Sequence, residues 1–118
     1  MNYVDGFLVP VPEGKLDDYR AMAEKAGKVW MKYGALSFHE CVADDVKPGE
    51  HTSFPQAVKL EDGETVMFSW ITYKSREHRD EVMEKVMADP FMKDFDPASM
   101  SFDGKRMIFG GFKEIVSL

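Results

Sequence analysis

The chain has 118 residues and a mass of 13.5 kDa. This length predicts one domain, residues 1–118. Chains of this length bury roughly 65% of their unfolded surface, which is enough for a core. Its 44% hydrophobic and 31% charged residues are typical of a globular protein and exclude a chain that is disordered or repetitive throughout. The net charge of −6 at pH 7, with no basic run longer than Lys105-Arg106, argues against nucleic acid as a partner, since proteins that bind it present a basic face to the phosphates.

The first strand and the first helix follow from the first third of the chain. The side chains of residues 2–12 form two alternating sets, as on the two faces of a strand, and they are rich in β-formers, which predicts a strand. Pro10 and Pro12 have no N–H to donate, so the end of this strand should lie at a sheet edge or leave the sheet. Apolar residues at steps of three and four predict a helix over 14–33, with Gly34 as its C-terminal stop.

The middle of the chain predicts two strands separated by an insert. Alternation over residues 35–43 predicts a strand with Phe38 and Glu40 on one face and His39 and Cys41 on the other. The insert, residues 45–64, is polar and rich in turn signals, and we expect a short strand at 56–60 within it. Residues 65–73 are apolar at nearly every position, which predicts a strand buried on both faces.

The last part of the chain predicts a helix and a final strand. Ser75 is an expected N-cap for a helix over 76–89 that ends before Pro90. The buried stripe of this helix is expected to contain Arg79, Val82, Met83, Val86 and Met87. The final strand is predicted over residues 105–118, with Gly110-Gly111 as a bulge or a point of close approach.

This order of elements, β-α-β-β-α-β with an extra short strand in the insert, predicts an α+β, ferredoxin-like fold. Its sheet would be antiparallel, with both helices on one face. The second face should also be apolar, because Val66, Phe68 and Trp70 point one way and Met67, Ile71 and Tyr73 the other. A face of about 350 Å² is of a size that marks an interaction surface. We therefore expect a face-to-face homodimer, with the insert reaching onto the partner.

Six segments resemble the YbaA-like family of uncharacterised bacterial proteins, and together they extend over nearly the whole chain. They are YVDGF, HECVADD, SFPQAVKL, VMFSW, KVMADP and FDGKRMIFGGF. The resemblance implies membership of the dimeric α+β barrel superfamily, in which two ferredoxin-like subunits pair their sheets into a barrel. That superfamily includes cofactor-independent antibiotic-type monooxygenases, muconolactone isomerases, chlorite-dismutase relatives and stress-responsive barrel proteins. It also implies a ligand cavity between the sheet and the helices.

Polar residues near such a cavity are the candidates for chemistry. Asp5 is flanked by aromatic residues two positions away on either side; buried, it would be a general base, or else it is a strand-end carboxylate held by a neighbouring backbone or tyrosine. His39 is a candidate polar positioner of a substrate, or a structural histidine. Glu40 is a candidate ligand-binding residue. Cys41 is a second one, or a small buried apolar residue.

Two further residues carry alternatives. Trp70 would stack on an aromatic ligand or fill the core. Arg106 would bind an anionic ligand or form an ion pair with Asp5 or Glu40. A group of methionines and phenylalanines would either line an apolar pocket near the second helix or pack adaptably in the core. These residues are Met67, Met83, Met87, Met92, Met107, Phe91 and Phe95.

Cofactor and metal motifs do not occur in the chain, so we expect neither a cofactor nor a metal. GxGxxG, GxxxxGK[ST], HExxH and GxSxG are all missing, and His-x-Cys is not a zinc spacing. Cys41 is the only cysteine, which excludes a disulfide within the chain. The N-terminus lacks the basic segment of a secretion signal, and no apolar run reaches the ~18 residues of a membrane span. These features favour a cytoplasmic protein that does not enter a membrane.

Three functions remain open on these grounds. The first is a cofactor-independent oxygenase or isomerase acting on a small, partly aromatic molecule, with Asp5 as base, His39 as positioner and Trp70 as stacking platform. The second is a non-catalytic dimeric module that binds a small apolar or aromatic ligand or serves a stress response. The third is a purely structural or interaction protein. A cavity of a few hundred Å³ within reach of Asp5 or His39 would favour the first two.

Overall fold

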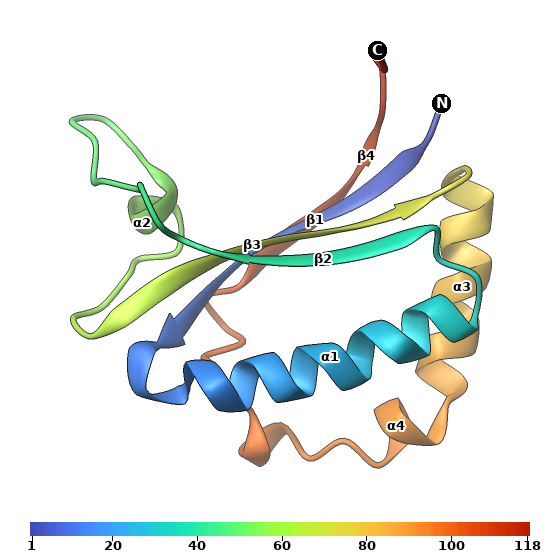
Figure 1. The fold of residues 1–118 in the computed structure, drawn as a ribbon, viewed down its shortest axis with the longest axis horizontal. Coiled ribbons are helices and arrows are strands. Elements are labelled where there is room, and N and C mark those ends of the chain that lie inside the picture. The colour runs from blue at the N-terminus through green and yellow to red at the C-terminus, as the bar shows by residue number, and fades with distance from the viewer.

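A computed structural model describes residues 1–118, and its topology is the predicted ferredoxin-like one. The sheet has the strand order β2-β3-β1-β4, and all neighbouring strands are antiparallel. The helices α1, α3 and α4 lie on one side of it (Figure 1). In chain order the elements are β1 Tyr3–Pro12, α1 Leu16–Lys32, β2 Ser37–Val42, α2 Phe54–Ala57, β3 Glu64–Tyr73, α3 Arg76–Ala88, α4 Pro90–Lys93 and β4 Ile108–Lys113, with single 3-10 turns at Glu13–Lys15 and Pro97–Ser99.

The strands β1 and β3 form the centre of the sheet and pair along their whole length, from Tyr3 opposite Tyr73 to Pro12 opposite Glu64. In contrast, β4 pairs with β1 only as far as Leu8. The end of β1 therefore has a neighbour on one side only, which is where proline is tolerated in a sheet. This confirms the expected edge position of Pro10 and Pro12.

The helices begin and end largely where the sequence predicts. The stripe of α1 that packs on the sheet contains Tyr19, Ala23 and Gly27, and Gly34 follows with a φ of +109° that favours glycine. The Ser75 side chain accepts a hydrogen bond from the backbone N–H of His78 and caps α3. None of the helices combines the length and apolar character that crossing a bilayer requires.

Three local predictions are wrong. The expected strand at 56–60 is absent, because Ser53 caps the short helix α2 by accepting from the Gln56 N–H. The final strand is shorter than 105–118: Arg106 lies in a turn before β4, and Ile115 beyond it is 82% exposed. Met87 is 54% exposed, since the stripe of α3 that enters the core is centred on Val82 and Val86.

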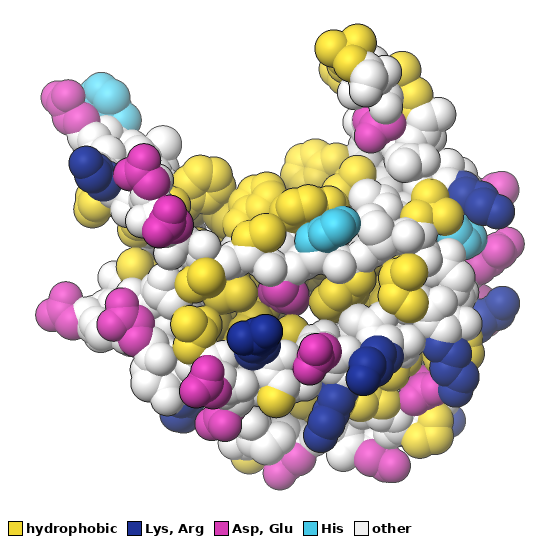
Figure 2. Space-filling view, viewed as in Figure 1, with side chains coloured by type: hydrophobic (Ala, Val, Ile, Leu, Met, Phe, Trp, Pro, Cys, Tyr) yellow, Lys and Arg dark blue, Asp and Glu magenta, His cyan; other side chains and the backbone are white.

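The second face of the sheet is apolar and uncovered, as the poor alternation of β3 predicts. Phe68, Ile108 and Phe112 are between 44% and 63% exposed there. Only α2 reaches over this face, where the ring of Phe54 lies 6.0 Å from that of Phe68. Figure 2 shows hydrophobic side chains gathered along the upper side of the sheet, between the arm formed by the insert and the C-terminal arm. We call this surface the open face.

Candidate functional site

A cavity of about 470 Å³ lies between the helix-covered side of the sheet and the helices. Of its 23 lining residues, 18 are hydrophobic, among them six methionines and six phenylalanines. The expected methionine-phenylalanine pocket near the second helix therefore exists, except that Met67 lies outside it. Its outer wall is α3, α4 and the segment that leads to β4. We call this hollow the inner cavity; it is large enough for a small organic molecule.

Asp5 occupies the floor of the inner cavity at one end. It is 6% exposed, and its Oδ1 accepts a hydrogen bond of 2.9 Å from Nη1 of Arg79 on α3. The other Nη of Arg79 donates to the hydroxyl of Tyr3 at 3.3 Å. Burial raises the pKa of Asp5, while the Tyr73 hydroxyl and the Arg79 guanidinium oppose this rise. Asp5 is thus a buried carboxylate with its charge compensated.

Two further contacts hold this end of the cavity in place. The indole N–H of Trp30 donates to the hydroxyl of Tyr73 at 3.2 Å, and that hydroxyl is bonded in turn to Asp5. A Cβ at Gly111 would collide with the hydroxyl of Tyr3, so this position needs glycine. The predicted special role of Gly110-Gly111 is therefore confirmed as a close approach, since the pairing of β4 with β1 runs through it without a bulge.

Glu40 lies across the cavity from Asp5, on β2. Its carboxylate accepts a hydrogen bond of 2.8 Å from the hydroxyl of Tyr19 on α1. Burial raises the pKa of Glu40, and hydrogen bonds from Tyr19 and Ser69 partly offset that rise. Burial likewise raises the pKa of Tyr19. The register sets Asp5 opposite Ile71 and Glu40 opposite Ser69, so their Cα atoms lie about 12 Å apart.

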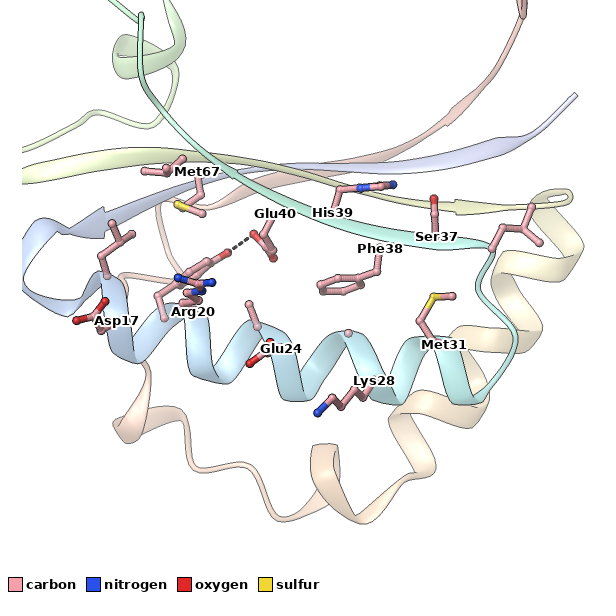
Figure 3. Close-up of a pocket in the computed structure, with 16 residues that line it drawn as sticks. Asp17, Arg20, Glu24, Lys28, Met31, Ser37, Phe38, His39, Glu40 and Met67 are labelled. Carbon is pink, nitrogen blue, oxygen red and sulfur yellow. Dashed lines mark hydrogen bonds between the residues drawn. The ribbon is translucent and has the colours of Figure 1, made fainter.

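A second hollow, of about 940 Å³, runs between α1 and the free edge of β2. We call it the outer groove. In Figure 3, Phe38 and Glu40 point from β2 toward α1, and His39 points away from it. The two hollows share Tyr19, Phe38 and Glu40 among their lining residues. The same side chains therefore border both hollows, and Glu40 is among them.

The other predicted site residues lie elsewhere. The rings of His39 and Trp70 stack at 4.5 Å, and Cys41 is exposed; all three are on the open face, although His39 also contributes to the wall of the inner cavity. The structure therefore brings Asp5 and Glu40 together, and separates them from Trp70 and Cys41. The alternative of Cys41 as a buried residue is wrong for the single chain, because α2 does not cover the face at Cys41, which is exposed.

Arg106 forms an ion pair, but with partners other than those expected. Its two Nη atoms donate to Glu64 at 2.7 and 2.6 Å, and its Nε donates to Asp103 at 3.0 Å. The expected pairs with Asp5 or Glu40 do not form. The reason is position: the β4 residue opposite Asp5 is Gly111, five residues beyond Arg106, which places Arg106 at the far end of the sheet.

Two residues of the cavity were not singled out as site residues from the sequence. Arg79 was expected only as part of a buried stripe, although a buried arginine needs a carboxylate and so points to a partner. Tyr19 belongs to the apolar stripe that predicts the helix over 14–33, although a buried hydroxyl also needs a partner. No group of three or more His, Cys, Asp or Glu side chains comes together in a way that could hold a metal ion.

Comparison with known proteins shows which family the chain belongs to. A family model described as "Protein of unknown function (DUF1428)" matches residues 2–104. The chain belongs to the DUF1428 family. It is also 54% identical over 116 residues, 98% of both chains, to the uncharacterized protein YbaA of Escherichia coli K12, and equally to that of Shigella flexneri. The sequence resemblance to the YbaA-like family is therefore confirmed.

Solved structures confirm the fold of this DUF1428 protein. An uncharacterized NIPSNAP domain protein from Burkholderia xenovorans has a TM-score of 0.55 at 14% identity, with 95% of this chain and 93% of that chain covered. A "putative antibiotic biosynthesis monooxygenase" from Bacteriodes thetaiotaomicron has a TM-score of 0.56 at 11% identity, with 98% and 90% covered. At these identities the likeness concerns the α+β fold alone.

Proposed function

We propose that this protein binds a small, largely apolar molecule in the inner cavity and acts on it as a cofactor-independent oxygenase or isomerase. The observation that carries the proposal is the cavity itself, of about 470 Å³, whose largely apolar lining includes the two carboxylates of Asp5 and Glu40. A purely structural protein has no need of buried acids around an empty volume, because each buried carboxylate costs stability. The similarity in fold to a monooxygenase-like protein supports the same class.

In this proposal Asp5 removes a proton from a carbon atom of the substrate. A raised pKa makes a carboxylate a stronger base, and the apolar surroundings exclude competing water. Returning the proton to a different carbon completes an isomerisation. In an oxygenation Asp5 instead takes the proton of a hydroquinone hydroxyl, and the resulting anion passes electrons to dioxygen, which the apolar cavity would admit. Arg79 and Tyr73 keep Asp5 oriented in either case.

A specific observation also favours the second candidate, a binding module without turnover. Asp5 already has Arg79 and Tyr73 as partners, and satisfied carboxylates of this kind are common structural elements. Binding would then depend on the apolar lining, and Asp5 would only fix the shape of the cavity.

Catalysis by Asp5 can be tested with Asp5→Asn, using Asp80→Asn as the control. Asp80 bonds the same arginine from the exposed side. Dioxygen consumption and product formation are measured with a panel of hydroquinones, and proton exchange into solvent D2O is followed by NMR. We expect a loss of about 100-fold or more for Asp5→Asn and little change for Asp80→Asn. Ligand binding with no turnover in the wild type would establish the binding module, and equal rates in the wild type and Asp5→Asn would remove Asp5 as the base.

The open face supports a further part of the proposal, a homodimer joined face to face. Phe68 and Phe112 would be covered by the same face of a second copy, as would His39, Trp70 and Cys41. The insert around α2 and the C-terminal arm both project on this side of the sheet (Figure 1). In the dimer both would contact the partner subunit.

A further inference from the structure

The inner cavity has one carboxylate that forms no ion pair. Asp5 is paired with Arg79. In contrast, Glu40 takes part in none of the ion pairs of the molecule, and its hydrogen-bond partners are hydroxyl groups. Because Asp5, Glu40 and Arg79 are the only Asp, Glu, Lys or Arg residues that line the cavity, its formal charge is negative at the Glu40 end.

The surroundings of Glu40 suit a positive charge. The rings of Tyr19 and Phe102 pack edge to face with their centroids 5.6 Å apart. Phe38 lies two positions before Glu40, on the same face of β2. Aromatic faces attract cations strongly once both are out of water. The polarisable thioether of Met22 lies in the same wall. A carboxylate within an aromatic and methionine lining is complementary to an organic ammonium group.

The position of Glu40 also determines how such a molecule would lie. Glu40 borders both the outer groove and the inner cavity, and Figure 3 shows it facing α1 beside the groove. A charged group held there stays near water, while an apolar body attached to it extends inward toward Asp5. A span of about 12 Å between the two Cα atoms leaves room for a molecule of one or two rings.

We propose that the inner cavity takes a lipophilic amine, with its ammonium group on Glu40 and its apolar body among the methionines and phenylalanines. The inference rests on the proposed function, because both place a small molecule in this cavity. It adds the chemical class: protonated amines are favoured, and carboxylates of the same shape are rejected because Glu40 repels them. The net charge of −6 helps to attract cations to the protein.

The test compares three probes that share one body: 4-phenylbutylamine, 4-phenylbutanol and 4-phenylbutanoate. Dissociation constants are measured by isothermal titration calorimetry at pH 7 for the wild type, Glu40→Gln and Glu24→Gln. Glu24 is the matched control, because it lines the outer groove but not the inner cavity. We expect the wild type to bind the amine about tenfold more tightly than the alcohol, as for a charge-assisted hydrogen bond, and to bind the carboxylate least.

The two variants test whether the preference for the amine depends on Glu40. Glu40→Gln should bind amine and alcohol equally well, and Glu24→Gln should behave as the wild type. Equal binding of amine and alcohol by the wild type, or a preference for the amine that survives Glu40→Gln, would overturn the inference and leave the proposed function intact. If none of the three probes binds the wild type, the small-molecule cavity of the proposed function fails together with the inference.

Discussion

At the scale of single residues, the two cavity carboxylates differ in what they cost the fold. Asp5 has a guanidinium beside it, whereas Glu40 is stabilised only by hydroxyl groups. A carboxylate that is buried without a cation favours its protonated form. Glu40 is therefore a position where the sequence retains a destabilising charge, which is a common property of functional sites.

This leads to a prediction for Glu40→Gln. Because the pKa of Glu40 is higher in the folded than in the unfolded chain, the folded state loses stability as the pH rises through that pKa. The amide removes the charge and still accepts a hydrogen bond from Tyr19. Thermal unfolding followed by circular dichroism should give a higher melting temperature for Glu40→Gln at pH 7. The difference should vanish below about pH 4, where the unfolded glutamate is also protonated.

The control for this prediction is Glu24→Gln, because Glu24 is an exposed residue of α1 that lines only the outer groove. It should leave the melting temperature unchanged at both pH values. A lower melting temperature for Glu40→Gln at pH 7 would mean that Glu40 stabilises the fold and would contradict the account of its charge.

At the scale of elements, the segment from Asp89 to Arg106, which includes α4, closes the inner cavity and is anchored at its two ends. At the first end Asp89 accepts a hydrogen bond of 2.6 Å from the hydroxyl of Tyr33 on α1. At the second end Arg106 binds Glu64 at the start of β3 through both Nη atoms. Between these anchors Met100 and Phe102 pack against the cavity as apolar side chains.

Glu64→Gln tests the second anchor. Arg106 donates hydrogen bonds to Glu64 and lowers the pKa of that carboxyl. A pKa that is lower in the folded state stabilises the protein above the unfolded value, about 4.3, and this stabilisation is lost as the pH falls through the folded value. We expect Glu64→Gln to lower the melting temperature at pH 7, and we expect this difference to shrink as the pH falls below about 4.3. Glu61→Gln is the control, since Glu61 touches the same arginine but is 66% exposed; an equal loss in both variants would contradict the anchor.

The elements also show what could be predicted from the sequence and what could not. Alternation alone correctly placed Glu40 and His39 on opposite faces of β2, but it did not indicate which face the helices cover, because that strand carries apolar residues on both. The pairing of Arg79 with Asp5 joins residues 74 positions apart, and no local pattern contains it. The helix α2 was missed because a short strand was expected at 56–60. Ser53 and Pro55 begin a helical turn there instead, and Val58 after it is buried.

At the scale of the whole molecule, the open face predicts the state of association. Sedimentation at micromolar concentration should give a mass near twice 13.5 kDa. Phe68→Asp should shift the protein toward the monomer, because it would place a charge in the centre of the buried interface. Met31→Asp is the control: Met31 is equally exposed, at 46%, but lies on α1. A wild type that sediments only as a monomer would refute the dimer and leave the inner cavity unaffected.

The two chain ends meet at one corner of the molecule. The backbone N–H of Glu114 donates to the carbonyl of Asn2 at 3.1 Å, and Figure 1 shows both ends emerging on the side of the open face. An affinity tag at either end would therefore stand beside the surface where a second copy would dock. Association measured on tagged protein would underestimate self-affinity, and cleavage of the tag should come before any such measurement.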